Sequence, residues 1–249
     1  MHRQASDERK LISPMRIEEN EIVIWTAPLR ASNDVISRYA QTLSADELRR
    51  AAAFRFPHLR ESYLVAHGVA RRILSNLTGT DPGDVRIVLG KNGKPELVNL
   101  EGLHFNMAHS GELMALAVTR VGPVGVDVEQ LRRLSDMKSL SEHFFSREER
   151  NQLECPQDVM AERFFRCWTL KEAFLKSTGE GLSRALDSFA VAFTSGAEAA
   201  LLRISEPSDD PRAWTLRSFD PAPGYTGACA IRATGVRLTH CNFDHQHGF

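Results

Sequence analysis

The sequence lacks the features that mark several large classes of protein. Its net charge is only −1 over 249 residues, which argues against a dedicated nucleic-acid-binding protein. No apolar run approaches the length needed to span a membrane. The first twenty residues are charged and have no apolar core, so they do not predict a secretory signal. We therefore expect a cytoplasmic protein with neither a membrane nor a nucleic-acid partner.

Motifs for common metal and catalytic sites are also missing. The four cysteines include no C-x-x-C pair, and the pattern is typical of reduced, packing cysteines in a cytosolic protein. No H-E-x-x-H or mixed His/Cys spacing predicts zinc. The G-x-x-x-x-G-K-[ST] phosphate loop and the G-x-S-x-G nucleophile elbow are both absent from the sequence. These absences argue against zinc enzymes, P-loop nucleotide hydrolases and α/β-hydrolases.

What is present includes an internal repeat at an offset of about one hundred residues. S-x-x-E capping boxes begin at Ser44 and Ser146, and each precedes an amphipathic helix that ends in Thr-Gly, at Gly79 and Gly179. An apolar strand lies upstream of each box. The pattern predicts an α+β fold of two similar α/β halves that meet near residue 122. The alternative is a chance match between two helices with common caps.

The repeat predicts three segments. Residues 1–20 would form an N-terminal arm, 21–122 an N-terminal α/β subdomain, and 123–249 a C-terminal α/β subdomain that carries the metal site. A length of 249 residues allows one large domain or two small ones of this kind.

Two acidic motifs in the second half suggest a metal site. The first, G-V-D-V-E, alternates as a strand does, with Val126 and Val128 on one face and Asp127 and Glu129 on the other. Two such close carboxylates repel each other unless a cation lies between them. Oxygen ligands of this kind suit Mg²⁺. For this motif alone, an ordinary exposed strand face is the better interpretation.

The second motif, W-T-L-K-E-A, lies on the repeated helix. Cys167, Leu170 and Phe174 form a buried stripe, and Glu172 and Lys176 lie on a neighbouring one. Glu172 would thus face a metal, and Lys176, one turn on, would reach a phosphate. The alternative is a simple surface pair of charges at i,i+4. In the first half, Arg72 occupies the position that corresponds to Glu172, so one half offers acid and the other offers base.

Two further candidates lie between the halves. Lys94 follows a Gly- and Asn-rich turn, which on its own is best interpreted as a solvated hairpin loop. His109 precedes a small polar turn and offers a donor to a phosphate oxygen. A lone histidine of this kind is more often structural.

Taken together and in order, the motifs are specific. G-K-P at 93–95, F-N-x-x-H-S-G at 105–111, G-V-D-V-E and W-x-x-K-E-A-F-x-K resemble the 4′-phosphopantetheinyl transferases of the Sfp type. The resemblance extends from about residue 43 to residue 189. It implies a monomer of two α/β subdomains related by a pseudo-twofold axis, which agrees with the repeat. It also implies transfer of the phosphopantetheine arm of coenzyme A to a carrier-protein serine, with release of adenosine 3′,5′-bisphosphate.

The resemblance also implies roles for individual residues. Mg²⁺ on the coenzyme A pyrophosphate would be held by Asp127, Glu129 and Glu172. Phosphate contacts would come from Lys94, His109 and Lys176, and the nucleotide end would be lined by Arg55 and Arg72. Glu172 and Lys176 are the catalytic candidates, with Glu172 as the base for the serine. One departure is Ala108, where many relatives have a serine whose hydroxyl is expected to reach a phosphate.

Two other classes of function stay open at this point. One is a different Mg²⁺-dependent nucleotide phosphoryl enzyme, and the other is a non-catalytic protein that binds coenzyme A or a carrier. The pathway of the carrier, fatty-acid, polyketide or peptide-synthetase, is not specified. Carriers are commonly acidic, so a basic or apolar docking surface is expected. The segment 131–159, with Phe144 and Phe145, is a candidate, and the alternative is a capped helix packed on the core.

Overall fold

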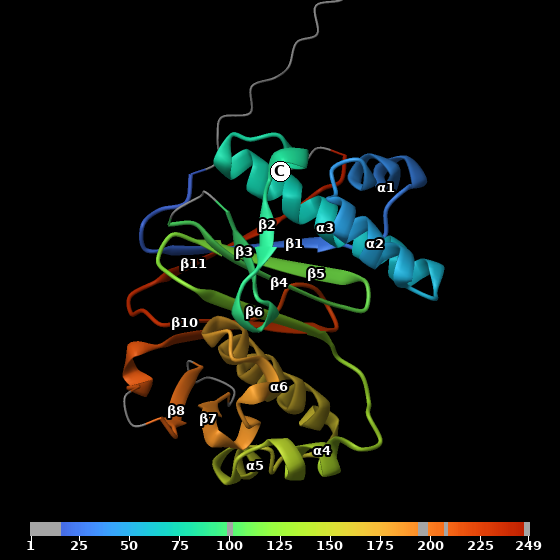
Figure 1. The fold of residues 1–249 in the computed structure, drawn as a ribbon. Coiled ribbons are helices and arrows are strands. Elements are labelled where there is room, and N and C mark those ends of the chain that lie inside the picture. The colour runs from blue at the N-terminus through green and yellow to red at the C-terminus, as the bar shows by residue number, and fades with distance from the viewer. Residues whose placement is uncertain (1–15, 99–101, 194–198, 207–208, 247–249) are drawn as a thin grey trace, which may run out of the picture.

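The computed structural model describes residues 16–98, 102–193, 199–206 and 209–246 (Figure 1). Most of the predicted arm, residues 1–15, therefore lies outside the described residues. The helices are α1 (Asn33–Ala40), α2 (Ala45–Ala53), α3 (Pro57–Thr78), α4 (Met137–Phe144), α5 (Arg147–Gln152) and α6 (Gln157–Thr178). The strands of the first half are β1 (Glu21–Pro28), β2 (Ile87–Leu89), β3 (Pro95–Leu97), β4 (His104–Ser110) and β5 (Leu113–Thr119). Those that follow are β6 (Val124–Gln130), β7 (Phe189–Ala192), β8 (Ala200–Ile204), β9 (Thr215–Phe219), β10 (Tyr225–Ile231) and β11 (Arg237–Asn242).

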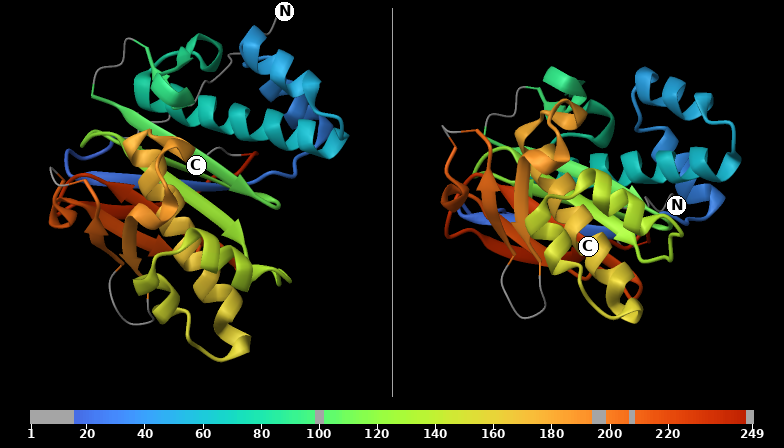
Figure 2. Two further views of the ribbon diagram at one scale, coloured as in Figure 1. Left: turned by 60° about the horizontal axis from the view of Figure 1, so that its bottom comes forward. Right: turned by 90° about the horizontal axis from the view of Figure 1, so that it is seen from below.

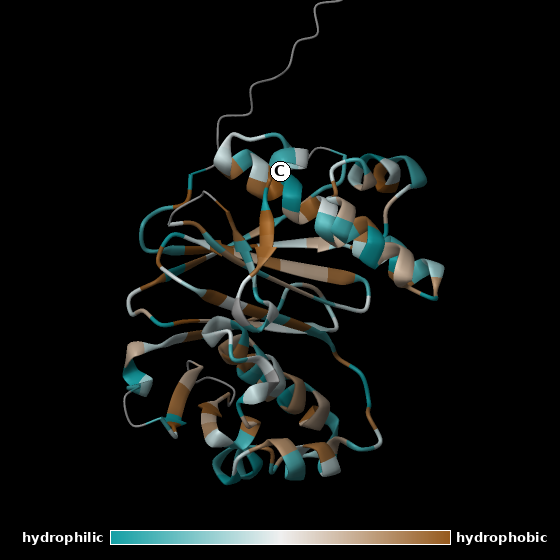
Figure 3. Ribbon diagram, in the orientation of Figure 1, coloured by the Kyte–Doolittle hydropathy of each residue, from teal (hydrophilic) through white to brown (hydrophobic). Residues whose placement is uncertain are grey.

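The chain forms two similar layered units, which confirms the predicted mixture of α and β structure. In the first, α3 covers a sheet of order β11-β1-β5-β4, and in the second, α6 covers a sheet of order β6-β10-β9. Figures 1 and 2 show the two long helices on the outer sides, with the two sheets between them. A shared apolar cluster fills the space between the sheets and draws on both, from Ile22 and Ile24 of β1 to Val126 and Val128 of β6. In Figure 3, β5 is pale brown to brown along its length, whereas the helices alternate between brown and teal.

The internal repeat extends to the order of the elements. The strands β1, β4 and β5 take the same antiparallel order in their sheet as β6, β9 and β10 take in theirs. Helices α3 and α6 are both 22 residues long and both end at a glycine in the left-handed region, with φ of 70° at Gly79 and 72° at Gly179. Both predicted capping boxes are formed, at Ser44 and at Ser146. The exact division at residue 122 stays a prediction.

Strand β11 was not anticipated from the sequence. It follows the second unit in the chain, yet it pairs in parallel with β1, from Glu21 opposite Arg237 to Thr26 opposite Asn242. The polar C-terminal segment is therefore the edge strand of the first sheet. Within the described residues, no helix is long and apolar enough to cross a membrane.

The glutamate of each capping box also forms a buried ion pair. The carboxylate of Glu47 lies 2.8 Å from Arg71 of α3, and the carboxylate of Glu149 lies 2.5 Å from Lys171 of α6. Glu47 and Glu149 close their capping boxes by accepting from the backbone N–H of the cap serines. In both halves, the same acid therefore joins the short helix to the long one.

The first of these pairs predicts a pH-dependent part of the stability. Burial would raise the pKa of Glu47, but hydrogen bonds from His67, Arg71 and Ser44 together outweigh it and lower the pKa from 4.5 to about 2. Because the folded pKa lies below the unfolded one, this stabilisation is present above pH 4.5 and is lost as the pH falls towards 2. We expect Glu47→Gln to destabilise the protein at pH 6 and much less at pH 3. Urea titrations at both pH values measure this, with exposed Glu61→Gln as control, and an equal loss at both would contradict it.

Candidate functional site

The two sheets meet along a seam between β4 and β6. The backbones of these two strands are not paired by hydrogen bonds. Side chains of β4 instead accept hydrogen bonds from backbone N–H groups of β6. The N–H of Val126 donates to Asn106 Oδ1 at 2.9 Å, and the N–H of Gln130 donates to Ser110 Oγ at 3.2 Å. These matched positions, 106 with 126 and 110 with 130, mean that the strands run in the same direction. The seam places residues from the two halves side by side.

Gly125 allows β6 to lie against α6. A Cβ at this position would be 1.9 Å from the carbonyl oxygen of Ala173 and 2.5 Å from the backbone nitrogen of Ser177. Any side chain would therefore force the strand and the helix apart. This close approach brings the acidic face of β6 against the polar stripe of α6.

Asp127 lies at the centre of the resulting cluster and is only 6% exposed. Lys176 donates to its Oδ1 at 2.7 Å, while its Oδ2 is buried and has no hydrogen-bond partner. Burial raises the pKa of Asp127 to about 7; the nearby charges of Glu172 and Glu129 add to the rise, and Lys176 opposes it. The alternation predicted for this strand is confirmed, since Val126 and Val128 pack between the sheets and Asp127 faces α6.

The charges of the other two carboxylates, Glu172 and Glu129, both act on Asp127. Burial raises the pKa of Glu172, Lys176 opposes the rise, and the charge of Glu129 adds to it. Glu129 accepts hydrogen bonds from Ser110 Oγ at 2.6 Å and from Arg132 at 3.1 Å. The charge of Glu129 thus raises the pKa of both Asp127 and Glu172, with Lys176 as a counter-charge, so a further cation would relieve the repulsion.

The donor set of this cluster fits Mg²⁺. Within the parts of the chain that the structure describes, no three His, Cys, Asp or Glu side chains form a ready-made metal group. Mg²⁺ does not need such a cage, since it is usually bound through one or two carboxylates together with waters and substrate phosphates. The unpartnered, buried Oδ2 of Asp127 is the feature that such an ion would satisfy.

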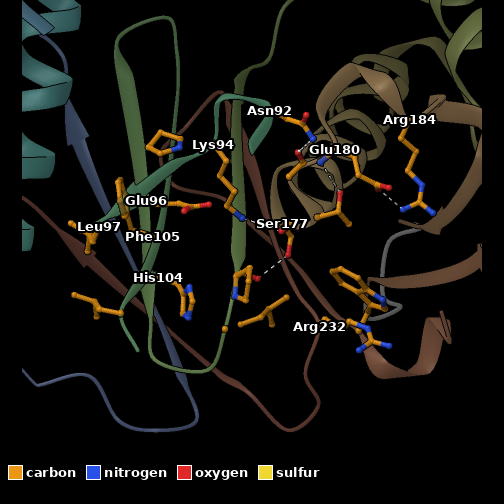
Figure 4. A pocket seen from close by; sticks show the side chains of 18 of the residues that line it. Asn92, Lys94, Glu96, Leu97, His104, Phe105, Ser177, Glu180, Arg184 and Arg232 are labelled. Carbon is orange, nitrogen blue, oxygen red and sulfur yellow. Dashed lines mark hydrogen bonds and ion pairs between the residues drawn. The ribbon is translucent and has the colours of Figure 1, made fainter. Parts of the chain in front are cut away.

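A cavity of about 970 Å³ opens between the two halves at the C-terminal end of α6 (Figure 4). Of the predicted site residues its described lining includes Lys94, but not the acidic cluster or His109. Lys94 enters the cavity from the β2–β3 loop, and its ammonium group donates to the carbonyl oxygens of Val124 at 3.1 Å and Ser177 at 3.0 Å. Asn92 donates to the carbonyl oxygen of Gly179 at 2.8 Å. The β2–β3 loop is therefore hydrogen-bonded to the C-terminal end of α6, the helix that carries Glu172 and Lys176. Burial lowers the pKa of Lys94 to about 8.

The amino-acid sequence is similar to those of known proteins. Residues 123–230 match the 4′-phosphopantetheinyl transferase superfamily. The chain is 36% identical over 220 residues to the 4′-phosphopantetheinyl transferase HetI of Nostoc sp., which covers 87% of this chain and 90% of that protein. It is 30% identical over 186 residues to the 4′-phosphopantetheinyl transferase Sfp of Bacillus subtilis, covering 73% and 80%. The chain belongs to the 4′-phosphopantetheinyl transferase family. Members of this family transfer phosphopantetheine to carrier proteins, and the chain is a transferase of this kind.

The structure of this transferase brings most of the predicted site residues together. Asp127, Glu129, Glu172 and Lys176 form the cluster described above. His109 lies at the end of β4 and keeps part of its surface in solvent. Partial burial of the ring, and then the charges of Lys176 and His67, lower its pKa, and the charge of Glu129 opposes this. Its neighbour Ser110 donates to Glu129, so His109 is next to the cluster along β4.

Two predicted nucleotide contacts lie elsewhere. Arg55 is exposed in the turn between α2 and α3, with its guanidinium 5.6 Å from the centre of the Phe56 ring. Arg72 is half-buried on α3, where its charge acts on Tyr39. Among the described residues that line the cavity of Figure 4, neither arginine occurs. Their predicted role at the nucleotide end stays a prediction.

The departure at position 108 has a packing reason. Ala108 is 7% exposed and belongs to the apolar cluster between the sheets. It points away from the face of β4 that carries His109, as period-two alternation requires. Alternation puts Ala108 on the same face of β4 as Asn106 and Ser110, so a hydroxyl here would face β6 and not the space beside His109.

Sequence reasoning missed several residues that shape the site. Ser110 donates to Glu129 and accepts from the backbone of β6. In the sequence, the only signal for Ser110 was its position next to His109 in the motif. Arg132 neutralises Glu129 from the loop after β6. Lys171, within the second acidic motif, does not face the site at all; it is fully buried against Glu149 and also donates to the carbonyl oxygen of Phe189.

Proposed function

We propose that this transferase moves 4′-phosphopantetheine from coenzyme A to a serine hydroxyl of an acyl or peptidyl carrier protein, with Mg²⁺ bound by Asp127, Glu129 and Glu172. The observation that carries the proposal is the buried, unpartnered Oδ2 of Asp127 among two further carboxylates. An acidic cluster that merely faced solvent would not bury one of its members to this extent.

The residues of the chain divide the chemistry among them. The serine Oγ forms a bond to the phosphorus nearest the pantetheine, and the bond from that phosphorus to the bridging oxygen breaks. The electron pair leaves on adenosine 3′,5′-bisphosphate. Bound Mg²⁺ would offset charge on the pyrophosphate oxygens. Lys176 holds the Asp127 carboxylate and adds a positive charge beside the same oxygens, while His109 and Lys94 contribute donors at the seam.

The serine proton needs an acceptor, and we assign it to Glu172. A carboxylate whose pKa is raised above its ordinary value is a better base near neutral pH. Burial supplies that rise here, with the charge of Glu129 adding to it. Because a bound Mg²⁺ would lower the basicity of the carboxylate oxygen that ligates it, Glu172 would receive the proton on its other oxygen or through a water.

We further propose that the protein acts as a cytoplasmic monomer. All four cysteines are free, which suits a reducing compartment. The site is assembled from the two halves of one chain, so transfer requires no second copy.

Chelation tests the metal in this proposal. The protein is incubated with coenzyme A and apo carrier, with Mg²⁺ or with excess EDTA, and release of adenosine 3′,5′-bisphosphate is followed. We expect release that needs both Mg²⁺ and the carrier. Release without carrier would favour a nucleotide hydrolase, coenzyme A binding without release would favour a non-catalytic protein, and undiminished release in EDTA would contradict the metal assignment.

A further inference from the structure

Large apolar side chains are exposed at the corner where α2 turns into α3. Leu48, Phe54, Phe56 and Leu59 are 40%, 40%, 51% and 42% exposed, and they lie within twelve consecutive residues. Phe144 and Phe145, the pair suggested by the sequence for docking, are by contrast half-buried and 1% exposed, and both pack near Trp168. We call residues 48–60 the α2–α3 corner.

The N-cap position of α3 holds a residue type that is disfavoured there. Phe56 is the N-cap of α3 and makes no side-chain capping hydrogen bond. Ser, Thr, Asp or Asn at an N-cap would stabilise the helix by about 1 kcal/mol relative to a residue that cannot cap. An aromatic ring at this position therefore costs stability, although 51% of Phe56 remains exposed. Such a residue is typical of a surface that another molecule covers.

The charge of the corner is of one sign. Residues 48–60 contain four arginines and no Asp or Glu. Arg49 pairs with Asp46 just outside the corner, and Arg50 interacts with the hydroxyl of Tyr63. Among ion pairs of the described residues, none includes Arg60, which is exposed. A covering molecule must therefore combine apolar contact with negative charge.

A row of rings connects the corner to the site. The ring centre of Phe54 is 5.5 Å from that of Tyr63, which stacks on His67 at 4.0 Å. The row follows α3, which packs over the face of β4 that carries Phe105 and, by alternation, His109. Ser110, the next residue of β4, donates to Glu129 of the cluster. A protein seated on the corner would thus have its edge at the seam where its serine must react.

We propose that the α2–α3 corner is the docking surface for the carrier protein, and that it takes an acidic helical face with apolar side chains among its carboxylates. The inference rests on the proposed function, since it concerns the second substrate of that same site. Arginines and aromatic rings are the side chains that most often dominate such contacts. Phe56 and Leu59 supply its central apolar contact, and Arg60 supplies positive charge beside them.

Two variants test the docking surface with little effect on the fold. Phe56→Ser/Leu59→Gln removes the apolar contact and adds an N-cap, and Arg60→Glu places an acid in the favourable first turns of α3. The control is Leu202→Ser, which changes an equally exposed residue on β8, far from the corner in Figure 1.

We expect each corner variant to raise KM for the apo carrier roughly tenfold or more, as loss of a central contact does. The rate at saturating carrier and the calorimetric affinity for coenzyme A should stay as in wild type. The effect of Arg60→Glu should fade in high salt. Binding of a carrier whose serine is replaced by alanine, which cannot react, should weaken in parallel.

Different outcomes overturn different claims. If wild-type protein modifies no carrier, the proposed function fails. If wild type transfers normally and both corner variants match Leu202→Ser in KM and in binding, only the docking surface is wrong. If wild type is a dimer and Phe56→Ser/Leu59→Gln makes it a monomer with unchanged KM, the corner is a contact between copies instead.

Discussion

Asp127→Asn and Glu172→Gln are each expected to slow transfer roughly a thousandfold or more, because each removes several kcal/mol of stabilisation from charge that develops on the pyrophosphate. Asn and Gln keep the size and some of the hydrogen bonding of the original side chains. In Asp127→Asn, Lys176 retains an oxygen to which it can donate. The loss should therefore appear in kcat with little change in the free energy of unfolding.

A matched control lies on the same helix. Glu162 is half-exposed on α6 and pairs with Arg166 at the surface. Glu162→Gln removes a carboxylate from α6 without touching the cluster, so its transfer rate should stay within about threefold of wild type. Steady-state kinetics on the three variants decide the matter, and near-normal kcat in Asp127→Asn or Glu172→Gln would show that the cluster is not the site.

The second large effect concerns stability and not chemistry. Lys171→Met is expected to destabilise the protein by about 3–5 kcal/mol, because it leaves the fully buried carboxylate of Glu149 without its counter-charge. The double variant Lys171→Met/Glu149→Gln should recover at least half of that loss. Gln keeps an oxygen for the N–H of Val191, which now donates to Glu149 at 2.9 Å.

Urea titration measures these stabilities, and transfer at low temperature supplies the control. Folded Lys171→Met should have near-normal kcat per folded molecule, since Lys171 faces away from the cluster. A double variant as unstable as Lys171→Met would contradict the assignment of the cost to a buried unpaired charge. A thousandfold loss of kcat in the folded variant would place Lys171 in the site after all.

The sequence predicted those parts of the site that follow from local periodicity. The alternation in G-V-D-V-E placed Asp127 opposite Val126 and Val128, and the stripe of Cys167, Leu170 and Phe174 is fully buried as expected. Caps and Thr-Gly helix ends located α3 and α6 because these signals act over a few residues.

Long-range packing decided the rest. Lys171 and Glu172 are neighbours in one motif, but one turns to the core and the other to the seam, which depends on where α5 and β7 pack. Lys94 resembled a free loop lysine, yet its ammonium group binds two carbonyl oxygens of the other half. No local pattern predicted that β11 would return to β1, because its partner lies more than two hundred residues earlier.

Mass spectrometry tests the proposed transfer most directly. An apo carrier protein is incubated with this transferase, coenzyme A and Mg²⁺, and the carrier and its peptide with the reactive serine are then weighed. We predict a gain of one phosphopantetheine on that serine with wild type and almost none with Asp127→Asn. No gain on acyl, polyketide and peptide-synthetase carriers alike, or an equal gain with Asp127→Asn, would contradict it.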